Sequence, residues 1–443
     1  MKFLKNLLQG DAREENAPED ASSPAQITQS HTPIEVGADF AALELPEELN
    51  RAIADLGFEN CTPVQKQVLP YSLDGRDIIA QAQTGTGKTA AFLIAIIAYD
   101  LENPTYDDRP PGTPFALIIA PTRELVLQIA DDAVHLTKHA NINVVSAVGG
   151  MDYERQKKQL AKDVGILIAT PGRLLDFCRN QVVDLSQVET LVIDEADRML
   201  SMGFIPDVKA IIRRTPYKDK RQTQLYSATF SEDIKRLAAS WTEDPVRVEI
   251  EPEQVAVDSV KQLTYMTSED DKFKVLFNLI QQEDLNRVII FVNRRDETRK
   301  LEDKLHQYGF RTGLLTGEVN QKKRIKTLDE FKSGDIQVLV ATDVAGRGIH
   351  VDDVSHVVNY NLPEDPEDYV HRIGRTGRAG STGISVSLAC ETDAFMLPNI
   401  EELLGEPLTF EHPPEELLAE LPPPVRKPRP APKKSPRPNR RRR

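Results

Sequence analysis

The sequence predicts an α/β protein with two parallel-sheet domains in tandem and a disordered tail at each end. Its 443 residues are too many for one typical domain. Short, continuous apolar runs alternate with amphipathic helical stretches, and this alternation occurs twice, on either side of the polar segment EIEPEQVAVDSV. Strands that are apolar on both faces and separated by helices indicate a parallel sheet covered on each side.

The expected parts follow one another along the chain. We expect a flexible acidic leader at residues 1–37, because residues 11–37 are rich in Asp, Glu, Pro, Ser and Ala and have no apolar periodicity. The first domain, residues 38–248, contains the strand candidates DIIAQA, FALIIAP, INVVSAVG, GILIATP, LVIDEA and QLYSAT. After a linker at 249–260, the second domain, residues 261–410, contains RVIIFVN, TGLLTG, IQVLVAT, SHVVNYN and GISVSLA. Residues 411–443 predict a disordered, basic, Pro/Arg/Lys-rich tail.

The composition is ordinary for a soluble globular protein, with 40% hydrophobic and 28% charged residues. No apolar run is long enough to span a bilayer, and polar residues interrupt the N-terminal MKFLKNLLQG before a signal-peptide core could form. Cys61, Cys178 and Cys390 are far apart and have no His or Cys neighbour at metal-binding spacing. We therefore expect a cytoplasmic protein without a membrane partner.

The charge is divided unevenly along the chain. The net charge is −14, yet residues 1–425 carry 45 basic and 69 acidic residues, and residues 426–443 carry ten basic residues and no acid. A basic, unstructured tail on an acidic body predicts a polyanionic partner, and nucleic acid is the expected one. The alternative is a tail that only solubilises the chain.

The segment AQTGTGKT, from Ala82 to Thr89, follows a strand candidate and precedes a helix, which is the context of a phosphate-binding loop. Glycines at 85 and 87 would let backbone amides close around phosphate oxygens, Lys88 would neutralise the β and γ phosphates, and Thr89 would ligate magnesium. The general pattern has glycine where this chain has Ala82. The alternative is a glycine-rich turn that binds no nucleotide. The expected nucleotide contacts in this loop are Ala82, Gln83, Thr84, Gly85, Thr86, Gly87, Lys88 and Thr89.

The run LVIDEADRML places three carboxylates after an apolar strand candidate, where parallel sheets bind ligands. Opposite a metal-bound triphosphate, Asp194 can hold the metal through its water shell, and Glu195 can orient and deprotonate the attacking water. For Asp197 we expect a neighbouring cation as the partner and no catalytic role.

The ordered motifs resemble those of the DEAD-box family of ATP-dependent RNA helicases. Besides AQTGTGKT and DEAD at 194–197, the chain contains PTREL from Pro121, Gly149-Gly150, TPGR from Thr170, SAT from Ser227, FVN from Phe291, QKKR from Gln321, ATDVAGRGIH from Ala341 and HRIGRTGR from His371. The resemblance covers residues 40 to 404. It implies two RecA-like domains with ATP and Mg²⁺ in the cleft between them and RNA across both.

The resemblance also implies roles for residues around the nucleotide. In GFENCTPVQ, Gln65 would pair with the edge of adenine, and Phe40 lies at the spacing of the stacking aromatic. Without the family, Gln65 reads as a surface residue and Phe40 as a core residue. Arg375 and Arg378 would reach the γ-phosphate. Ser227, Thr229 and His371 would couple the nucleotide state to the grip on RNA.

RNA contact in this family goes mainly to the sugar-phosphate backbone, which implies slight sequence preference. Taken singly, each glycine among the matching residues could be a plain turn and each arginine a surface ion pair. The matching residues are Thr122, Arg123, Gly150, Thr170, Gly172 and Arg173 in the first domain and Gln321, Arg324, Thr342 and Gly346 in the second.

Two departures from the family pattern lie in ATDVAGRGIH. Gly346 fills a small position that usually holds Ala or Ser, and His350 replaces an Asp that commonly touches the ATP ribose. An imidazole can still bond a hydroxyl, so His350 predicts an ATP affinity that varies mildly near neutral pH. Together with ISVSLACE, LPNIEELLG and the Arg-rich tail, this histidine resembles the bacterial RhlB-type branch. That resemblance implies an RNase E-like endoribonuclease as a partner in RNA decay.

The expected activity is RNA-stimulated ATP hydrolysis coupled to local unwinding of short RNA duplexes. A DNA-translocating helicase is one alternative, and an ATP-gated RNA clamp without turnover is another.

Overall fold

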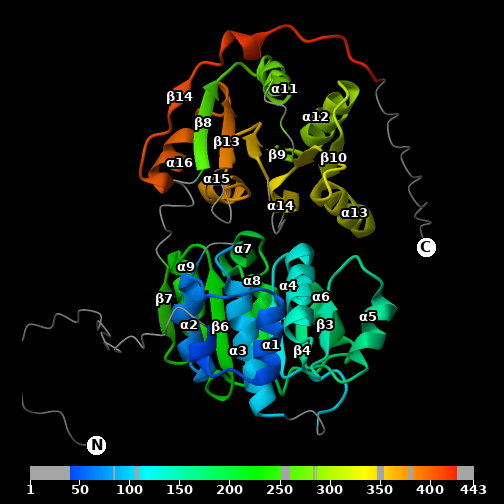
Figure 1. Cartoon of the computed structure of the whole chain (residues 1–443), viewed down its shortest axis with the longest axis vertical. Coiled ribbons are helices and arrows are strands. Elements are labelled where there is room, and N and C mark those ends of the chain that lie inside the picture. Colours follow the sequence, from blue (N-terminus) through cyan, green and yellow to red (C-terminus); the bar gives the residue numbers. More distant parts are fainter. Residues whose placement is uncertain are drawn as a thin grey trace, which may run out of the picture. The chain divides into compact units, whose positions relative to one another are not determined.

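The computed structural model describes residues 40–82, 85–104, 109–250, 260–282, 285, 287–346, 354–377 and 383–426 (Figure 1). The expected leader, most of the linker and the chain beyond residue 426 lie outside these ranges. The described residues form two seven-stranded sheets with helices on both faces of each. The predicted pair of parallel-sheet domains is therefore confirmed. Among the described residues, no helix has both the length and the apolar character needed to cross a bilayer.

The first sheet has the strand order β3-β4-β2-β5-β6-β1-β7, and its neighbouring strands are parallel. Its strands are β1 (Ile78–Gln81), β2 (Ala116–Ile119), β3 (Val144–Ala147), β4 (Ile166–Ala169), β5 (Thr190–Ile193), β6 (Gln222–Ser227) and β7 (Val246–Glu249). The helices before α5 are η1 (Phe40–Leu43), α1 (Glu47–Asp55), α2 (Pro63–Leu73), α3 (Lys88–Glu102) and α4 (Arg123–Leu136). The others are α5 (Tyr153–Leu160), α6 (Pro171–Arg179), α7 (Ala196–Ser201), α8 (Ile205–Ile212), η3 (Lys218–Lys220) and α9 (Glu232–Trp241).

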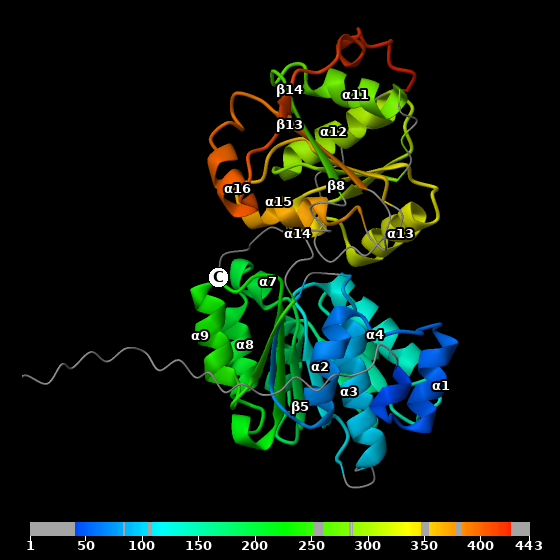
Figure 2. The same cartoon turned by 60° about the vertical axis from the view of Figure 1, so that its left-hand side comes forward.

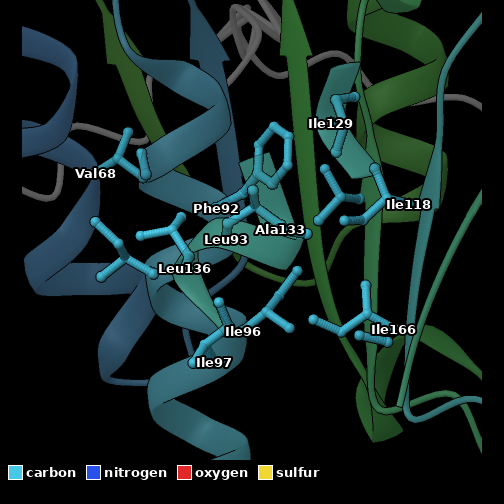
Figure 3. Close-up of a cluster of buried hydrophobic side chains, with 14 of the residues drawn as sticks. Val68, Phe92, Leu93, Ile96, Ile97, Ile118, Ile129, Ala133, Leu136 and Ile166 are labelled. Atoms are coloured by element: carbon cyan, nitrogen blue, oxygen red, sulfur yellow. The ribbon is translucent and has the colours of Figure 1, made fainter. Parts of the chain in front are cut away.

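The central strands of this sheet are buried on both faces. Along β2, Ala116 and Ile118 belong to one hydrophobic cluster, and Leu117 and Ile119 belong to another. Figure 3 shows the first cluster, in which side chains of α3 and α4 lie against those of β2 and β4. Because successive side chains of a strand point to opposite faces, a continuous apolar run of four residues fills both cores.

The second sheet has the order β10-β11-β9-β12-β13-β8-β14, again with parallel neighbours. Its strands are β8 (Val260–Met266), β9 (Val288–Phe291), β10 (Thr312–Leu315), β11 (Val338–Ala341), β12 (His356–Asn359), β13 (Gly383–Ala389) and β14 (Phe410–Glu411). The helices are α11 (Lys272–Gln282), α12 (Arg295–Gln307), α13 (Gln321–Lys332), α14 (Asp343–Gly346), α15 (Pro366–Ile373), α16 (Leu397–Leu404) and η4 (Glu415–Leu418).

The structure shortens the tail that we expected from residue 411. Residues 410–426, here called the C-terminal strap, lie along the second domain beside α11 (Figures 1 and 2). β14 pairs with β8, and the Asn278 side chain donates hydrogen bonds to the carbonyls of Leu417 and Ala419 at 3.0 and 2.9 Å. The amides of Val425 and Arg426 both donate to the Gln307 carbonyl at 2.9 Å. The strap is therefore part of the second domain.

Candidate functional site

The predicted site residues of the first domain gather where its strands end. The phosphate loop follows β1, Thr122 follows β2, Gly150 lies just after β3, Thr170 follows β4 and Asp194 follows β5. These strands are parallel, so their carboxyl ends share one edge of the sheet, where open α/β sheets bind ligands.

The phosphate loop places a buried cation at the positive end of a helix. Gly87 caps α3 with a φ of 92°, and a Cβ at this position would lie 2.7 Å from the Gln65 amide nitrogen, so glycine is required there. Lys88 opens α3 and is only 6% exposed. Its Nζ donates to the Ala82 carbonyl at 2.7 Å and lies 4.0 Å from the Asp194 carboxylate. A buried ammonium beside unsatisfied helix amides suits a polyphosphate, and Thr89 lies in the same first turn.

The Gln65 side chain is fixed against this loop. Its carbonyl accepts from the Thr62 amide at 2.8 Å in a capping box at the start of α2, and its amide donates to the Gly87 carbonyl at 3.2 Å. Each group keeps capacity for one more hydrogen bond. Phe40 is 4% exposed and stacks on Phe58 with ring centroids 6.5 Å apart, so it is packed as a core residue. The adenine roles of Gln65 and Phe40 remain predictions.

Asp194 and Glu195 are two buried carboxylates at the end of β5. Burial raises the pKa of Asp194 to about 6, and the nearby Lys88 opposes that rise. Asp194 also accepts the Glu195 amide at 3.0 Å. Glu195 is 5% exposed, adopts a left-handed backbone conformation with φ of 51°, and its Oε2 has no hydrogen-bond partner among the described residues. A buried, unpartnered oxygen at a strained residue is typical of a functional site.

The partner of Asp197 differs from our expectation. Among the described residues, its carboxylate forms no ion pair with a cation and accepts the backbone amides of Ala228 and Thr229, both at 3.0 Å. The Asp197 amide in turn donates to the Ser227 hydroxyl at 3.2 Å. Backbone amides can take the place of a cation as partners of a carboxylate, because each N–H group carries a partial positive charge. Asp197 thus ties the DEAD segment to the SAT segment within the first domain.

The residues near Lys88 suit magnesium better than a metal that needs a full protein cage. Among the described residues, no group of three or more His, Cys, Asp or Glu side chains could hold a metal ion. Mg²⁺ keeps several waters and is commonly held by one or two carboxylates together with substrate phosphates. The Asp194 carboxylate and the Thr89 hydroxyl are oxygen groups of the kind that hold this ion.

The first-domain residues predicted to contact RNA begin helices or follow strands. Thr122 caps α4 by accepting the Leu125 amide at 3.3 Å, and Arg123 begins that helix. The Arg123 guanidinium lies against Gly150, which has a φ of 78°, and any side chain there would collide with it. Thr170 is the residue before α6, and Gly172 and Arg173 lie in the first turn of this helix. A Cβ on Gly172 would meet no other atom within 4 Å.

In the second domain the predicted RNA contacts lie at the start of α13 and after β11. Gln321 opens α13, and Arg324 donates to the Ala345 carbonyl. The Thr342 carbonyl accepts the Gly346 amide at 2.7 Å, which forms the short turn of α14. A Cβ on Gly346 would collide with the buried Phe291 ring. This contact explains why the smallest residue fills the position at which the sequence departs from the family pattern.

The HRIGRTGR segment contains a residue that our sequence reasoning did not select. Arg372 is 1% exposed; it donates two hydrogen bonds to Asp343 at 2.6 and 2.7 Å, one to Asn293 at 2.8 Å and one to the Asn361 carbonyl at 2.7 Å. It therefore joins the FVN, ATD and HRIGR segments. The only indication of its importance in the sequence was its position between His371 and Arg375, which were both selected.

Of the selected neighbours of Arg372, His371 lies in the last turn of α15 and Arg375 lies in the turn that follows this helix. Arg375 is buried, and its Nε donates to the His371 carbonyl at 3.0 Å. Burial lowers the pKa of His371, so the imidazole is neutral at pH 7. Four selected residues, Gln83, Thr84, His350 and Arg378, lie outside the described residues.

Known families match both domains. The DEAD/DEAH box helicase family matches residues 62–237, and the helicase conserved C-terminal domain family matches residues 271–380. The chain is 57% identical over 384 residues to a protein of Pseudomonas aeruginosa (strain UCBPP-PA14) named ATP-dependent RNA helicase RhlB, covering 86% of this chain and 97% of that one. It is 46% identical to the protein of the same name from Shewanella sp. (strain MR-4), covering 87% and 88%.

Solved helicases share the architecture. The structure is similar to S. cerevisiae Dbp5 bound to RNA and ADP BeF3, with a TM-score of 0.76 and 31% identity over 85% of this chain and 95% of that chain. It is also similar to Mss116p bound to ssRNA and AMP-PNP, with a TM-score of 0.73 and 28% identity over 84% and 78%.

Proposed function

The chain belongs to the DEAD-box family of ATP-dependent RNA helicases, in its RhlB-type branch, and on this premise we propose that it separates short RNA duplexes locally during RNA decay. As an RNA helicase it binds RNA and hydrolyses ATP in an RNA-dependent reaction.

Glu195 is proposed as the general base of hydrolysis. The observation that carries this role is its buried carboxylate, whose Oε2 has no hydrogen-bond partner among the described residues. The adjacent Asp194 lies 4.0 Å from the Lys88 ammonium. Glu195 accepts a proton from a water whose oxygen attacks the γ-phosphorus, the bond to the bridging oxygen breaks, and ADP leaves. Lys88 and the amides at the start of α3 hold the phosphate oxygens. Arg375 and Arg378 stabilise the charge on the transferring group.

Thr89 and Asp194 would hold Mg²⁺, which when bound neutralises charge on the phosphate oxygens. Gln65 would select adenine through the free hydrogen-bonding capacity of its amide, and Phe40 would pack against the base. His350 would contact the ribose.

The proposed coupling uses the link between the DEAD and SAT segments. Asp197 joins Ser227 and Thr229 to the strand end that carries Asp194 and Glu195. A change at the nucleotide would therefore displace the SAT turn, and His371 would respond to it from the second domain. ATP and single-stranded RNA would together close the two domains around the nucleotide, and a bent strand could not stay paired.

Replacing Glu195 tests the proposed base. Glu195→Gln should reduce RNA-stimulated ATP turnover by a factor of about 10² or more, because general-base catalysis typically contributes that much. Binding of a fluorescent ATP analogue should be retained, since the amide keeps the size of the side chain. Unchanged turnover would remove Glu195 from the mechanism, and lost nucleotide binding would show that it holds ATP instead.

A comparison of polymers tests the substrate class. Single-stranded RNA should raise ATP turnover of the full chain, and single-stranded DNA of the same sequence should raise it far less. Short duplexes with a few base pairs should be separated at stoichiometric ATP, and long duplexes should not. Equal stimulation by DNA would favour a DNA translocase, and RNA binding without turnover would favour a clamp.

A role in RNA decay and an RNase E-like partner are proposed from the resemblance to the RhlB-type branch. Cys178 and Cys390 form no disulfide among the described residues, which suits the proposed reducing cytoplasm. Co-sedimentation of the purified chain with a purified RNase E-like endoribonuclease tests the partner. Failure to associate at micromolar concentrations would remove it.

A further inference from the structure

We propose that Tyr153 is a positioning residue for RNA binding, because its ring and that of Phe177 form an aromatic seat that orients the Arg173 guanidinium. This inference rests on the proposed function, in which Arg173 contacts the RNA backbone. Tyr153 is not assigned an RNA contact of its own. It acts through Arg173, and the aromatic seat is defined here as the rings of Tyr153 and Phe177.

The geometry of the seat is specific. The ring centroids of Tyr153 and Phe177 are 4.9 Å apart with an interplanar angle of 33°. The Arg173 guanidinium carbon lies 5.3 Å from the Tyr153 centroid and 5.5 Å from the Phe177 centroid. Both distances fall within the range of cation–π attraction, and a guanidinium is the cation that most often makes it. One cation is thus shared by two rings.

The donors of Arg173 are almost uncommitted. Its Nη2 makes one long hydrogen bond of 3.4 Å to the Met151 carbonyl, and its Nη1 is buried without a hydrogen-bond partner in the described chain. The described residues provide no carboxylate ion pair for it. Arg372 shows the opposite case, since Asp343 and carbonyl groups occupy its donors. The rings therefore hold Arg173 without accepting hydrogen bonds from its N–H groups.

The Tyr153 ring is itself held from several sides. Tyr153 begins α5, which Asp152 caps by accepting the Arg155 amide at 3.1 Å. The Gln156 side chain holds the preceding loop by accepting the Val148 amide at 2.8 Å and donating to the Val148 carbonyl at 3.2 Å. The Tyr153 hydroxyl accepts from Asn180 at 3.3 Å.

The same short segment after β3 therefore supports two arginines that are predicted to contact RNA. Gly150 gives Arg123 a flat backbone surface, and three residues later Tyr153 gives Arg173 a flat ring. Orienting a long side chain before RNA arrives reduces the entropy lost on binding. A carboxylate could orient Arg173 equally well, but it would occupy the donors and repel the phosphate.

The competing explanation is that Tyr153 only fills space. It is partly buried and packs against the hydrophobic cluster that includes Leu160 and Phe177. Under that explanation, Tyr153→Leu would change the stability of the protein and leave the RNA concentration needed for half-maximal ATPase activity unaltered. The two explanations therefore differ in the RNA concentration that gives half-maximal ATPase activity of the full chain.

Three variants measure this quantity. Tyr153→Leu should raise the half-saturating RNA concentration about three- to tenfold, with kcat at saturating RNA within about twofold. Tyr153→Phe keeps the ring and should stay within about twofold. Tyr217→Leu is the matched control, because Tyr217 is 69% exposed on another loop of the same domain. A similar shift in the Phe variant would assign the effect to the hydroxyl and overturn the seat.

A double-mutant cycle with Arg173→Ala decides whether Tyr153 acts through Arg173. Arg173→Ala should raise the half-saturating RNA concentration about tenfold or more. Adding Tyr153→Leu in that background should change it less than about twofold. If the two effects multiply, Tyr153 acts independently and the inference fails while Arg173 keeps its role. If Arg173→Ala alone has no effect, the proposed RNA contact of Arg173 fails.

Thermal denaturation of each variant separates folding from binding. A Tyr153→Leu protein with a lower Tm and an unchanged RNA requirement would establish the space-filling role and overturn the inference. A raised RNA requirement in a protein of unchanged Tm would support it.

Discussion

At the scale of single residues, burial of the ionised Asp132 carboxylate lowers the stability of the folded protein. It lies on α4, and burial raises its pKa to about 6, with a smaller contribution from Asp131. The unfolded pKa is near 3.8, so above pH 6 the carboxylate is ionised in both states and folding bears the full cost of burying the charge. As the pH falls from 6 towards 4, the folded protein takes up the proton and the cost disappears.

Asp132→Asn should therefore stabilise the protein at pH 8 by roughly 1 kcal/mol or more. The gain should shrink at pH 4.5. Urea denaturation of the variant and the parent at both pH values measures it. The exposed neighbour provides the control, since Asp131→Asn should give a smaller gain. An equal gain at the two pH values would mean that the charge of Asp132 is not responsible.

Glycine is needed at position 346 because a larger residue would collide with the Phe291 ring. Gly346→Ala places a methyl group against the Phe291 ring, and overpacking of this kind costs about 1–3 kcal/mol. The Tm should fall, and Phe291→Leu should restore part of the loss in the double variant by making space. If the double variant is less stable than the sum of the single changes, the collision is not the cause.

At the scale of elements, the C-terminal strap should behave as part of the second domain. Deleting residues 411–443 removes Leu417 from a hydrophobic cluster and leaves the Asn278 amide without its carbonyl partners. These losses should cost several kcal/mol by the usual values for a buried leucine and for unsatisfied polar groups. Deleting residues 427–443 alone should leave the Tm unchanged. Equal Tm values for the two deletions would show that the strap contributes nothing.

The central strands could be predicted from the sequence because burial on both faces produces continuous apolar runs. The runs ALII, ILIA and VIIF became β2, β4 and β9. The edge strand β7 and the strands β8 and β14 were not recognised. In β7 and β8 exposed and buried residues are mixed, and β14 has only two residues, so none of them has the apolar signature of a central strand.

Candidate site residues could be selected from the sequence only where chemistry restricts the residue type. Lys88, Asp194 and Glu195 belong to motifs whose spacing follows from the shape of a phosphate loop and a strand end. The partners of Asp197 among the described residues are backbone amides, which carry no sequence signal, and the cation that we expected is not among them. Arg372 and Tyr153 act through contacts with residues distant in the sequence, and only the fold brings these together.

At the scale of the whole molecule, the charge asymmetry predicts how the chain binds RNA. Ten basic residues in 426–443 would release phosphate counterions on binding, and the rest of the chain has a net charge of −24. Deleting 427–443 should weaken RNA affinity and flatten its dependence on salt. Fluorescence anisotropy with labelled single-stranded RNA measures this between about 50 and 200 mM salt, a range over which such slopes are resolved. Parallel slopes would exclude the tail from RNA contact.

The pairing of β14 with β8 has a consequence for solubility. β8 has seven residues and would otherwise be the last strand of its sheet, with open backbone groups along one side. Such an edge can recruit strands from other molecules. By placing a two-residue strand opposite Thr264 and Tyr265, the chain blocks the C-terminal part of that edge with its own backbone. Proteins cut before Phe410 should therefore precipitate as sheet-rich aggregates even where catalysis survives.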